Sequence, residues 1–292
     1  MIRACLRPAA RSRCWRASLA LAVLVTAAAL EPSSAQQDVL RVCQDPNNLP
    51  FSNHAGQGFE NKIAELLARE LGWKLEYFSF PQRMGFIRNT LRFKLPGEQY
   101  RCDLVIGVPA DYDQVWATRP YYHSTYVLIY PQGGKLEGVH TGKDLDAAIA
   151  RDQLAGLRIG VFDRSPASEW LVKHGLLEQA VVYRMLNADP DFYPGEVIEK
   201  DLAAGKLDAA IVWGPIAGFV SQRLKDSRLT LVPLPSEPPV RLDYEIAMGV
   251  RYGEREWKAT VERLLAEHKN DIDHILREYG VPLLDADGQL KQ

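Results

Sequence analysis

The sequence has 292 residues, of which 47% are hydrophobic and 25% are charged, and its formal net charge is −2. This near-neutral balance argues against a nucleic-acid-binding protein, which would carry a basic stripe, so no nucleic-acid partner is expected. The length suits one large domain or two domains of ordinary size.

Residues 1–35 have the features of a secretory signal peptide. An apolar run, 17–30, follows five arginines, and residues 33–35 (SSA) resemble a cleavage site. The run is too short to span a membrane, and no Cys follows it directly, so neither a membrane anchor nor a lipid anchor is expected. We expect a soluble periplasmic protein that starts near Gln36. Without five of the 35 basic residues and one of the 37 acidic ones, its net charge is −6.

The two remaining cysteines, Cys43 and Cys102, favour a disulfide because the predicted compartment is oxidising. Two buried free thiols are the alternative. Cys43 ends one predicted strand and Cys102 begins another, so parallel pairing could hold the two residues too far apart.

Strand and helix patterns alternate through the first part of the mature chain. Strands are predicted at 39–43, 73–80, 102–109 and 121–131, and helices at 59–72 and 83–91. Alternating strands and helices imply a parallel sheet with right-handed crossovers.

The second part repeats this order. Strands are predicted at 157–162, 180–186, 207–215, 229–235 and 244–250, and helices at 165–175, 194–206, 218–227, 254–268 and 270–279. The polar, glycine-rich segment 132–138 and the proline-dense segment 233–241 are predicted to cross between two units. We therefore expect an α/β fold with two parallel-sheet lobes: 36–130 with 242–292, and 131–241.

Three predicted strands end in segments rich in turn residues: DPNNLPFSN (45–53), GVP (107–109) and WGP (213–215). Ligands of parallel α/β sheets bind outside the carboxyl ends of the strands. We therefore expect these three segments to converge on one ligand-facing site.

Several segments together resemble a known family: LRVCQDPNNLPFSN, RCDLVIGVPADYDQVWATRPYYHSTYV, AGKLDAAIVWGPIAGF and YEIAMGVRYGEREWK. They look like the quinoprotein-dehydrogenase-associated periplasmic binding proteins, the J proteins of methanol-dehydrogenase gene clusters (MoxJ/XoxJ type). The resemblance covers nearly all of the mature chain and implies the type II periplasmic-binding-protein fold. It also implies a role in assembling or activating a dehydrogenase that depends on pyrroloquinoline quinone (PQQ).

By this resemblance the protein is not an enzyme and binds no cofactor of its own. PQQ and a calcium or lanthanide ion belong to the partner, a periplasmic methanol or alcohol dehydrogenase. The alternative is a solute receptor of an ABC transporter for a small ligand that is not an amino acid.

Two positions separate the chain from the amino-acid binders of this fold. Those proteins carry an Arg after the third strand, which clamps the ligand carboxylate, and an Asp before the proline in the second lobe, which holds the ligand ammonium. The corresponding residues here are Asp111 and Trp213. Phe51 keeps the aromatic platform of the amino-acid binders. Amino-acid binding is therefore disfavoured.

The candidate ligand or partner site collects residues from these segments: Asp45, Asn47, Asn48, Phe51, Pro109, Asp111, Tyr121, Ser165, Trp213 and Gly214. Trp213 either walls the site or fills the hinge-side core. Ser165 either helps to bind an anion at a helix N-terminus or is a plain helix cap. Neighbouring residues of a strand face opposite sides, so only one of Tyr121 and Tyr122 can face the site, and we favour Tyr121.

Arg83 and Arg119 could serve an anionic ligand or a partner's acidic patch, but we favour surface ion pairs for both. No nucleophile, zinc-protease or phosphate-loop motif occurs. Asp271 and His274 share a helix face, yet two such residues do not make a metal site. We expect neither catalysis nor a bound metal.

Overall fold

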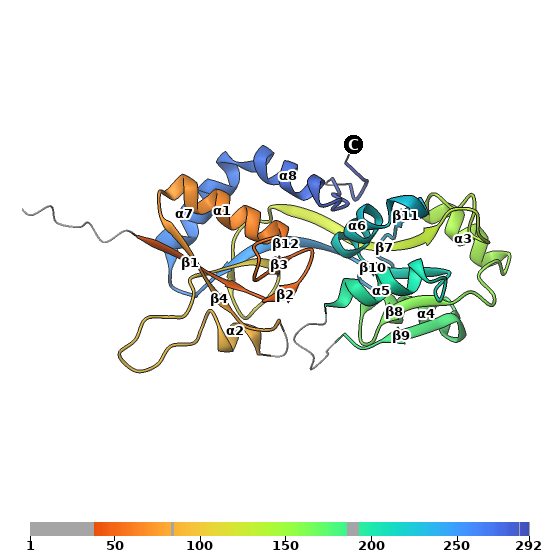
Figure 1. Cartoon of the computed structure of the whole chain (residues 1–292), viewed down its shortest axis with the longest axis horizontal. Coiled ribbons are helices and arrows are strands. Elements are labelled where there is room, and N and C mark those ends of the chain that lie inside the picture. Colours follow the sequence, from red (N-terminus) through yellow and green to blue (C-terminus); the bar gives the residue numbers. More distant parts are fainter. Residues whose placement is uncertain (1–37, 83–84, 186–192, 286, 292) are drawn as a thin grey trace, which may run out of the picture. The chain divides into compact units, whose positions relative to one another are not determined.

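The computed structural model describes residues 38–82, 85–185, 193–285 and 287–291, which belong to one compact unit (Figure 1). The predicted signal peptide and Arg83 lie outside the described residues.

Ten strands form one sheet in the order β4-β1-β5-β12-β7-β10-β8-β9, with β11 paired to β7 and β6 paired to β12. They are β1 (Val39–Gln44), β4 (Lys74–Ser79), β5 (Leu104–Pro109), β6 (Trp116–Ala117), β7 (Tyr122–Pro131), β8 (Ile159–Phe162), β9 (Ala180–Tyr183), β10 (Ala209–Trp213), β11 (Leu229–Pro233) and β12 (Asp243–Val250). A separate hairpin joins β2 (Asn47–Asn48) and β3 (Ser52–Asn53). Strands β4, β1 and β5 are parallel, as are β10, β8 and β9, so the two predicted groups of parallel strands are present.

Strands β7 and β12 connect these two groups (Figure 1). The first part of β7 pairs antiparallel with β12, and its second part pairs with β10 and β11. The expected lobe boundary at residue 130 therefore falls inside β7. The crossover expected at 132–138 is wrong, because β7 itself carries the chain from the first group to the second before residue 132. The proline-dense segment 233–241 does connect the two groups, since it runs from β11 to β12, and the Thr125 hydroxyl donates to the Leu234 (2.5 Å) and Leu242 (3.1 Å) carbonyl oxygens near its two ends.

The helices cover the sheet with their apolar faces. They are α1 (Phe59–Leu71), α2 (Phe86–Asn89), α3 (Gly142–Ala150), α4 (Pro166–Lys173), α5 (Pro194–Ala203), α6 (Gly214–Arg223), α7 (Arg255–Glu267) and α8 (Lys269–Glu278), with single 3₁₀ turns at Leu177–Gln179 and Lys225–Ser227. In α1, Ile63 and Leu67 are buried on one face, and Gly72 ends the helix in the left-handed region.

Two helix predictions need correction. The helix expected at 83–91 is only the four-residue α2, because Gly85 precedes it with φ of +86° and cannot belong to a helix. Helix α3 was missed. It begins at Thr141, whose hydroxyl accepts from the Asp144 backbone N–H while the Asp144 carboxylate accepts from the Thr141 N–H, a capping box of short polar residues.

The predicted disulfide is confirmed: Cys43 and Cys102 are bonded, with their Cα atoms 5.3 Å apart. The expected obstacle is absent because β5 begins only at Leu104, which leaves Cys102 outside the strand and able to turn toward Cys43.

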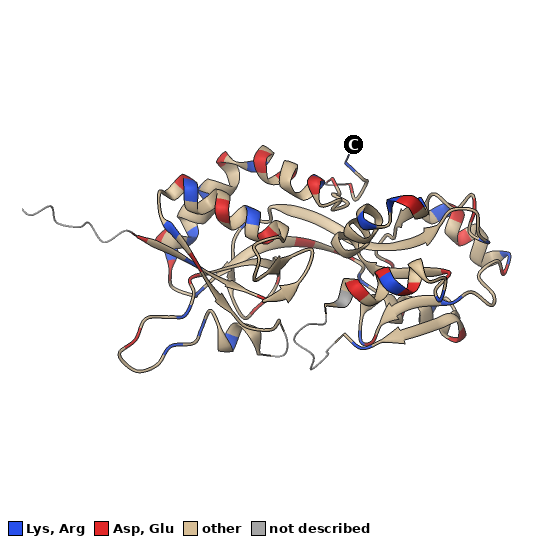
Figure 2. Cartoon of the chain, viewed as in Figure 1, with Lys and Arg blue, Asp and Glu red and all other residues tan. Residues whose placement is uncertain are grey.

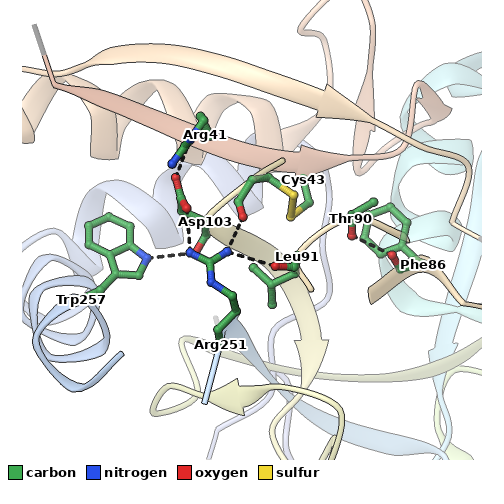
Figure 3. Close-up of a disulfide and its surroundings, with 9 residues drawn as sticks. Arg41, Cys43, Phe86, Thr90, Leu91, Asp103, Arg251 and Trp257 are labelled. Atoms are coloured by element: carbon green, nitrogen blue, oxygen red, sulfur yellow. Dashed lines mark hydrogen bonds and ion pairs between the residues drawn. A yellow bond between two sulfur atoms is a disulfide. The ribbon is translucent and has the colours of Figure 1, made fainter. Parts of the chain in front are cut away.

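Arg251 holds the neighbourhood of the disulfide together (Figure 3). Its guanidinium donates to the carbonyl oxygens of Leu91 (3.0 Å) and Cys102 (2.5 Å). It also pairs with the carboxylates of Asp103 (2.7 Å) and Glu254 (2.6 Å). We call these residues the Arg251 cluster. It ties β12 and the start of α7 to the segment before β5.

Charges of both signs are interspersed on the described helices (Figure 2). On α7 and α8 they pair at i,i+4 spacing: Lys258–Glu262, Arg263–Glu267 and Lys269–Asp273. Helix pairs at this spacing contribute only about 0.3–0.5 kcal/mol each, and of these three only Arg263–Glu267 has both side chains well exposed. They keep the helix surfaces polar without defining a site.

Candidate functional site

The loop after β1 is fixed by its own polar side chains. The Asp45 carboxylate accepts from the backbone N–H of Asn47 (2.9 Å) and from that of Gln82. The Ser52 hydroxyl donates to the Asp45 carbonyl oxygen (2.9 Å). The Asn48 side chain donates to the Gln82 side-chain oxygen (2.9 Å). The turn residues of DPNNLPFSN therefore build a defined hairpin.

This hairpin is bound to the N-terminus of α1. The Glu60 backbone N–H donates to the Phe51 carbonyl oxygen (2.9 Å). At Gly58 a Cβ would lie 2.0 Å from that same oxygen, so only glycine permits the contact. Asn61, 1% exposed, accepts from the backbone N–H groups of Asn53 and Gly58, both at 3.1 Å. Phe51 and Glu60 are thereby brought side by side.

A pocket of about 260 Å³ lies where this hairpin meets the ends of β5 and β10. Its lining comes from the hairpin, α1 and the sheet: Phe51, Glu60, Gln82, Gly107, Pro109, Tyr122, Tyr126, Trp213, Tyr244 and Ile246. We call it the aromatic pocket.

The register of the sheet explains which side chains line the aromatic pocket. Ile246 of β12 pairs with Pro109 of β5 on one side and with Tyr122 of β7 on the other. Tyr126 of β7 pairs with Trp213 of β10. Directly paired residues face the same side, and so do residues two or four apart along a strand. One face of four adjacent strands therefore forms the floor.

The rings are close enough to form a box around a small ligand. The Trp213 ring centroid lies 5.6 Å from that of Tyr126 and 5.8 Å from that of Tyr244, the latter edge to face. The Phe51 ring packs 5.3 Å from that of Phe59. Aromatic pairs at these distances hold one another in place, so the walls are fixed before a ligand arrives.

Glu60 is the carboxyl group among the described residues that line this pocket. Its carboxyl lies against β5, where a Cβ on Gly107 would be 2.2 Å from Glu60 Oε1, so glycine makes room for it. Among the described residues we find no hydrogen bond or ion pair to this carboxyl. Burial, with a smaller contribution from the Asp45 charge, raises the pKa of Glu60 to about 8.

An ion pair stands at the rim. Arg241 pairs with Asp111, and its guanidinium carbon lies 4.4 Å from the centroid of the Tyr244 ring. The hydrogen bond from Arg241 lowers the pKa of Asp111 below its usual range. Among the described residues, the Arg241 cation beside the pocket residue Tyr244 is thus already paired with a carboxylate.

Several predicted residues lie in this region. Phe51, Pro109 and Trp213 line the pocket, and Asp45 and Asn48 position Gln82, which lines it too. Asn47 belongs to the β2–β3 hairpin, and Asp111 lies at the rim.

Four of the residues considered in the sequence analysis do not line the pocket. Tyr122 lines the pocket instead of Tyr121, whose hydroxyl donates to the Ile106 carbonyl oxygen (3.1 Å) in the core. Ser165 is 2% exposed and caps α4 by accepting from the Ser168 N–H, so the plain-cap reading holds. Gly214 is a packing residue, because a Cβ there would lie 2.6 Å from the Thr125 carbonyl oxygen. The Arg119 backbone N–H donates to Glu262, outside the pocket.

The pocket residues that the sequence did not reveal are Glu60, Gln82, Tyr244 and Ile246, whereas Gly107 belongs to the predicted segment 107–109. Glu60 follows the GF dipeptide at the start of a predicted helix, where an acidic residue is read as a favourable first-turn charge. The glycine in VIGVP was the available signal, since a glycine inside a strand marks a close approach by another group.

A larger cavity of about 590 Å³ lies near the Arg251 cluster, and Trp73 and Trp257 are among its lining residues. Several of its charges are already paired, because Asp103 pairs with both Arg41 and Arg251, and Glu254 pairs with Arg251. The described residues contain no group of three or more His, Cys, Asp or Glu placed to hold a metal. None of the described helices is long and apolar enough to cross a membrane.

Comparison with protein-family models finds no match. Protein MoxJ of Paracoccus denitrificans is 31% identical over 267 residues, which cover 87% of this chain and 92% of that protein. This level of identity over almost the whole relative decides the family. The chain belongs to the MoxJ family.

Two further relatives agree with this assignment. Protein MoxJ of Methylorubrum extorquens is 28% identical over 279 residues, covering 89% of this chain and 86% of the relative. The crystal structure of the periplasmic binding protein XoxJ from Methylobacterium extorquens is 39% identical, with a TM-score of 0.67, and covers 84% of this chain and 99% of XoxJ. The predicted fold class is therefore confirmed for this MoxJ-family chain.

Proposed function

We propose that this protein is a periplasmic accessory factor of a PQQ-dependent methanol or alcohol dehydrogenase and assists its assembly or activation. The observation that carries the proposal is a MoxJ-family chain whose binding-protein pocket has lost both amino-acid anchors. Asp111, the residue at the expected carboxylate clamp, is acidic and paired with Arg241. Trp213, the residue at the expected ammonium anchor, is an aromatic wall.

In this proposal the chemistry of alcohol oxidation stays with the partner. The dehydrogenase would hold PQQ and its calcium or lanthanide ion, and the present chain would bind rather than catalyse. Its signal peptide would place it in the compartment where the disulfide between Cys43 and Cys102 can form.

The proposal is tested in a methylotroph that carries this gene. With a tagged protein expressed during growth on methanol, we expect a quinoprotein dehydrogenase to copurify. In the deletion strain we expect dehydrogenase activity to fall and to return with the wild-type gene. Absence of the dehydrogenase from the purified sample, together with normal activity in the deletion strain, would contradict the proposal.

Paired variants locate the functional surface. Trp213→Ala removes a wall of the aromatic pocket, so it should prevent complementation while the protein stays folded by circular dichroism. Arg119→Ala is the control, because its exposed side chain lies outside the pocket and should leave complementation intact. Full complementation by folded Trp213→Ala would move the partner surface away from the pocket.

The second candidate function is that of a solute receptor for an ABC transporter. The aromatic pocket itself favours it, because a formed cavity with a few polar groups is the usual form of a small-molecule site. A deletion strain that oxidises methanol normally but takes up one nitrogen or carbon source poorly would support the receptor and count against the accessory factor.

A further inference from the structure

We propose that the aromatic pocket binds a small organic ammonium cation, held by the Glu60 carboxylate and by the faces of the surrounding rings. This inference concerns the ligand of the pocket and does not depend on which of the two functions above the protein performs.

The first argument is that the Glu60 carboxyl has no hydrogen-bond or ion-pair partner among the described residues. Glu60 is half-buried, and a carboxyl that has lost part of its hydration is normally paired or hydrogen-bonded, since desolvating an unpaired charge is costly. Neighbouring buried polar side chains follow this rule, because Asn61 bonds to Gln44 (2.8 Å), which in turn bonds to Ser79 (3.0 Å). Glu60, one residue before Asn61, has no such partner among the described residues. A cationic ligand would supply it.

The second argument is the composition of the walls. Phe51, Tyr122, Tyr126, Trp213 and Tyr244 present five rings to a single cavity. Aromatic faces attract alkylammonium groups through their quadrupole, and Trp is the strongest of them. A box of rings with one carboxyl is the arrangement by which proteins select such cations over neutral molecules.

The third argument is the balance of charge. The acids near the cavity are Glu60 and Asp45, and the charge of Asp45 acts directly on Glu60. At the rim, the charge of Arg241 is balanced by Asp111. The described lining residues include no Lys, Arg or His, so an anionic ligand would find no cation in the cavity, and carboxylates and phosphates are disfavoured.

The fourth argument is size. Pockets for drug-sized ligands measure about 300–1,000 Å³. The aromatic pocket, at about 260 Å³, is below that range. It therefore suits an amine with few carbon atoms.

Cation binding should be coupled to loss of a proton. Asp45 on the hairpin adds a negative charge near Glu60, and burial raises the pKa values of the nearby tyrosines Tyr77, Tyr121 and Tyr122. Because the Glu60 carboxyl is protonated below about pH 8 in the empty site, a permanent cation must displace that proton. Its affinity should rise with pH up to that value, by at most about tenfold per pH unit.

The experiment compares three probes by calorimetric or NMR titration of the mature protein at constant ionic strength. Choline is a permanent cation, 3,3-dimethylbutan-1-ol is its neutral isostere, and 3,3-dimethylbutanoate is an anion of similar shape. We expect choline to bind at least about tenfold more tightly than the alcohol, a difference of about 1.4 kcal/mol. The anion should bind most weakly. Equal affinity for choline and the alcohol, or no binding of choline at ~10 mM, would overturn the proposal.

Variants assign the effect to Glu60. Glu60→Gln should weaken choline binding at least about tenfold, abolish its pH dependence and leave the alcohol unaffected. Glu65→Gln is the matched control, because Glu65 lies on the same helix but pairs with Lys62 at the surface. Trp213→Phe keeps a ring and should retain part of the affinity, providing a second test if Glu60→Gln does not fold. Unchanged choline affinity in folded Glu60→Gln would also overturn the proposal.

Discussion

The Arg251 cluster and the aromatic pocket both place charge inside the protein, but they differ in how that charge is matched. Arg251, whose side chain is 11% exposed, pairs with the Asp103 carboxylate and two carbonyl oxygens (Figure 3), and also with the Glu254 carboxylate. Glu60 lines a cavity with no partner among the described residues. Charged groups that pair with one another hold chain segments together, whereas a carboxyl without a partner can still bind a ligand. The comparison predicts that damage to the first region unfolds the protein and damage to the second spares the fold.

The largest expected effect comes from the disulfide that borders the Arg251 cluster. Replacing both Cys43 and Cys102 by Ala should lower the free energy of unfolding by about 4 kcal/mol, because the unfolded chain is released from a loop of sequence separation 59. Denaturant unfolding of the oxidised wild type and the double variant measures this loss of stability. Reduced wild type should show a similar loss, and equal stability of all three forms would contradict the structural role.

Arg251→Met should have the second-largest effect and lower the free energy of unfolding by about 3 kcal/mol. The substitution leaves the Asp103 and Glu254 carboxylates without the cation that they share. The matched control is Arg255→Met, four residues away on an exposed position, which should change stability by less than about 0.5 kcal/mol. A comparable loss in both variants would show that the cluster is not specially important.

At Glu60 we expect a substitution to raise the free energy of unfolding instead of lowering it. Its folded-state pKa of about 8 is above its usual value, so its contribution to stability is fully present below about pH 4.5 and is lost as pH rises through 8. Glu60→Gln should therefore be more stable than wild type at pH 8.5, by about 1–3 kcal/mol because the side chain is only half-buried. The difference should vanish near pH 4. Unfolding titrations at both pH values decide this, and a pH-independent difference would mean that Glu60 does not titrate as inferred.

The two regions also differ in how far the sequence predicted them. Phe51, Pro109 and Trp213 were predicted because each belongs to a strand end or the loop that follows, where the rule for parallel sheets applies. Tyr244 was missed because it lies on the antiparallel β12, to which that rule does not extend. Choosing between Tyr121 and Tyr122 required the pairing of Tyr122 with Ile246, a long-range contact that strand periodicity cannot supply.

The same limit explains the crossover and the Arg251 cluster. Proline and glycine content suggested that 132–138 connects the lobes, yet an extended strand can cross while keeping its ladder of hydrogen bonds, as β7 does. Arg251 and Asp103 are 148 residues apart, so their pairing is visible only once β5 and β12 are neighbours. Local patterns predict elements, whereas register decides which charges are matched.

The smallest expected effect on stability concerns Asp111, and it sharpens the comparison because this ion pair belongs to the pocket rim and yet is matched. Asp111→Asn should change the free energy of unfolding by less than about 1 kcal/mol, since both partners are exposed to solvent.

Asp111→Asn should nevertheless weaken choline binding, by about two- to fivefold at low salt, because Arg241 over the Tyr244 ring would then repel the cation unopposed. High salt should reduce the effect. Asp113→Asn, two residues away and exposed, is the control and should leave the affinity unchanged. Stronger choline binding in Asp111→Asn would mean that the rim pair does not act by screening Arg241, and would leave Glu60 alone to account for cation selection.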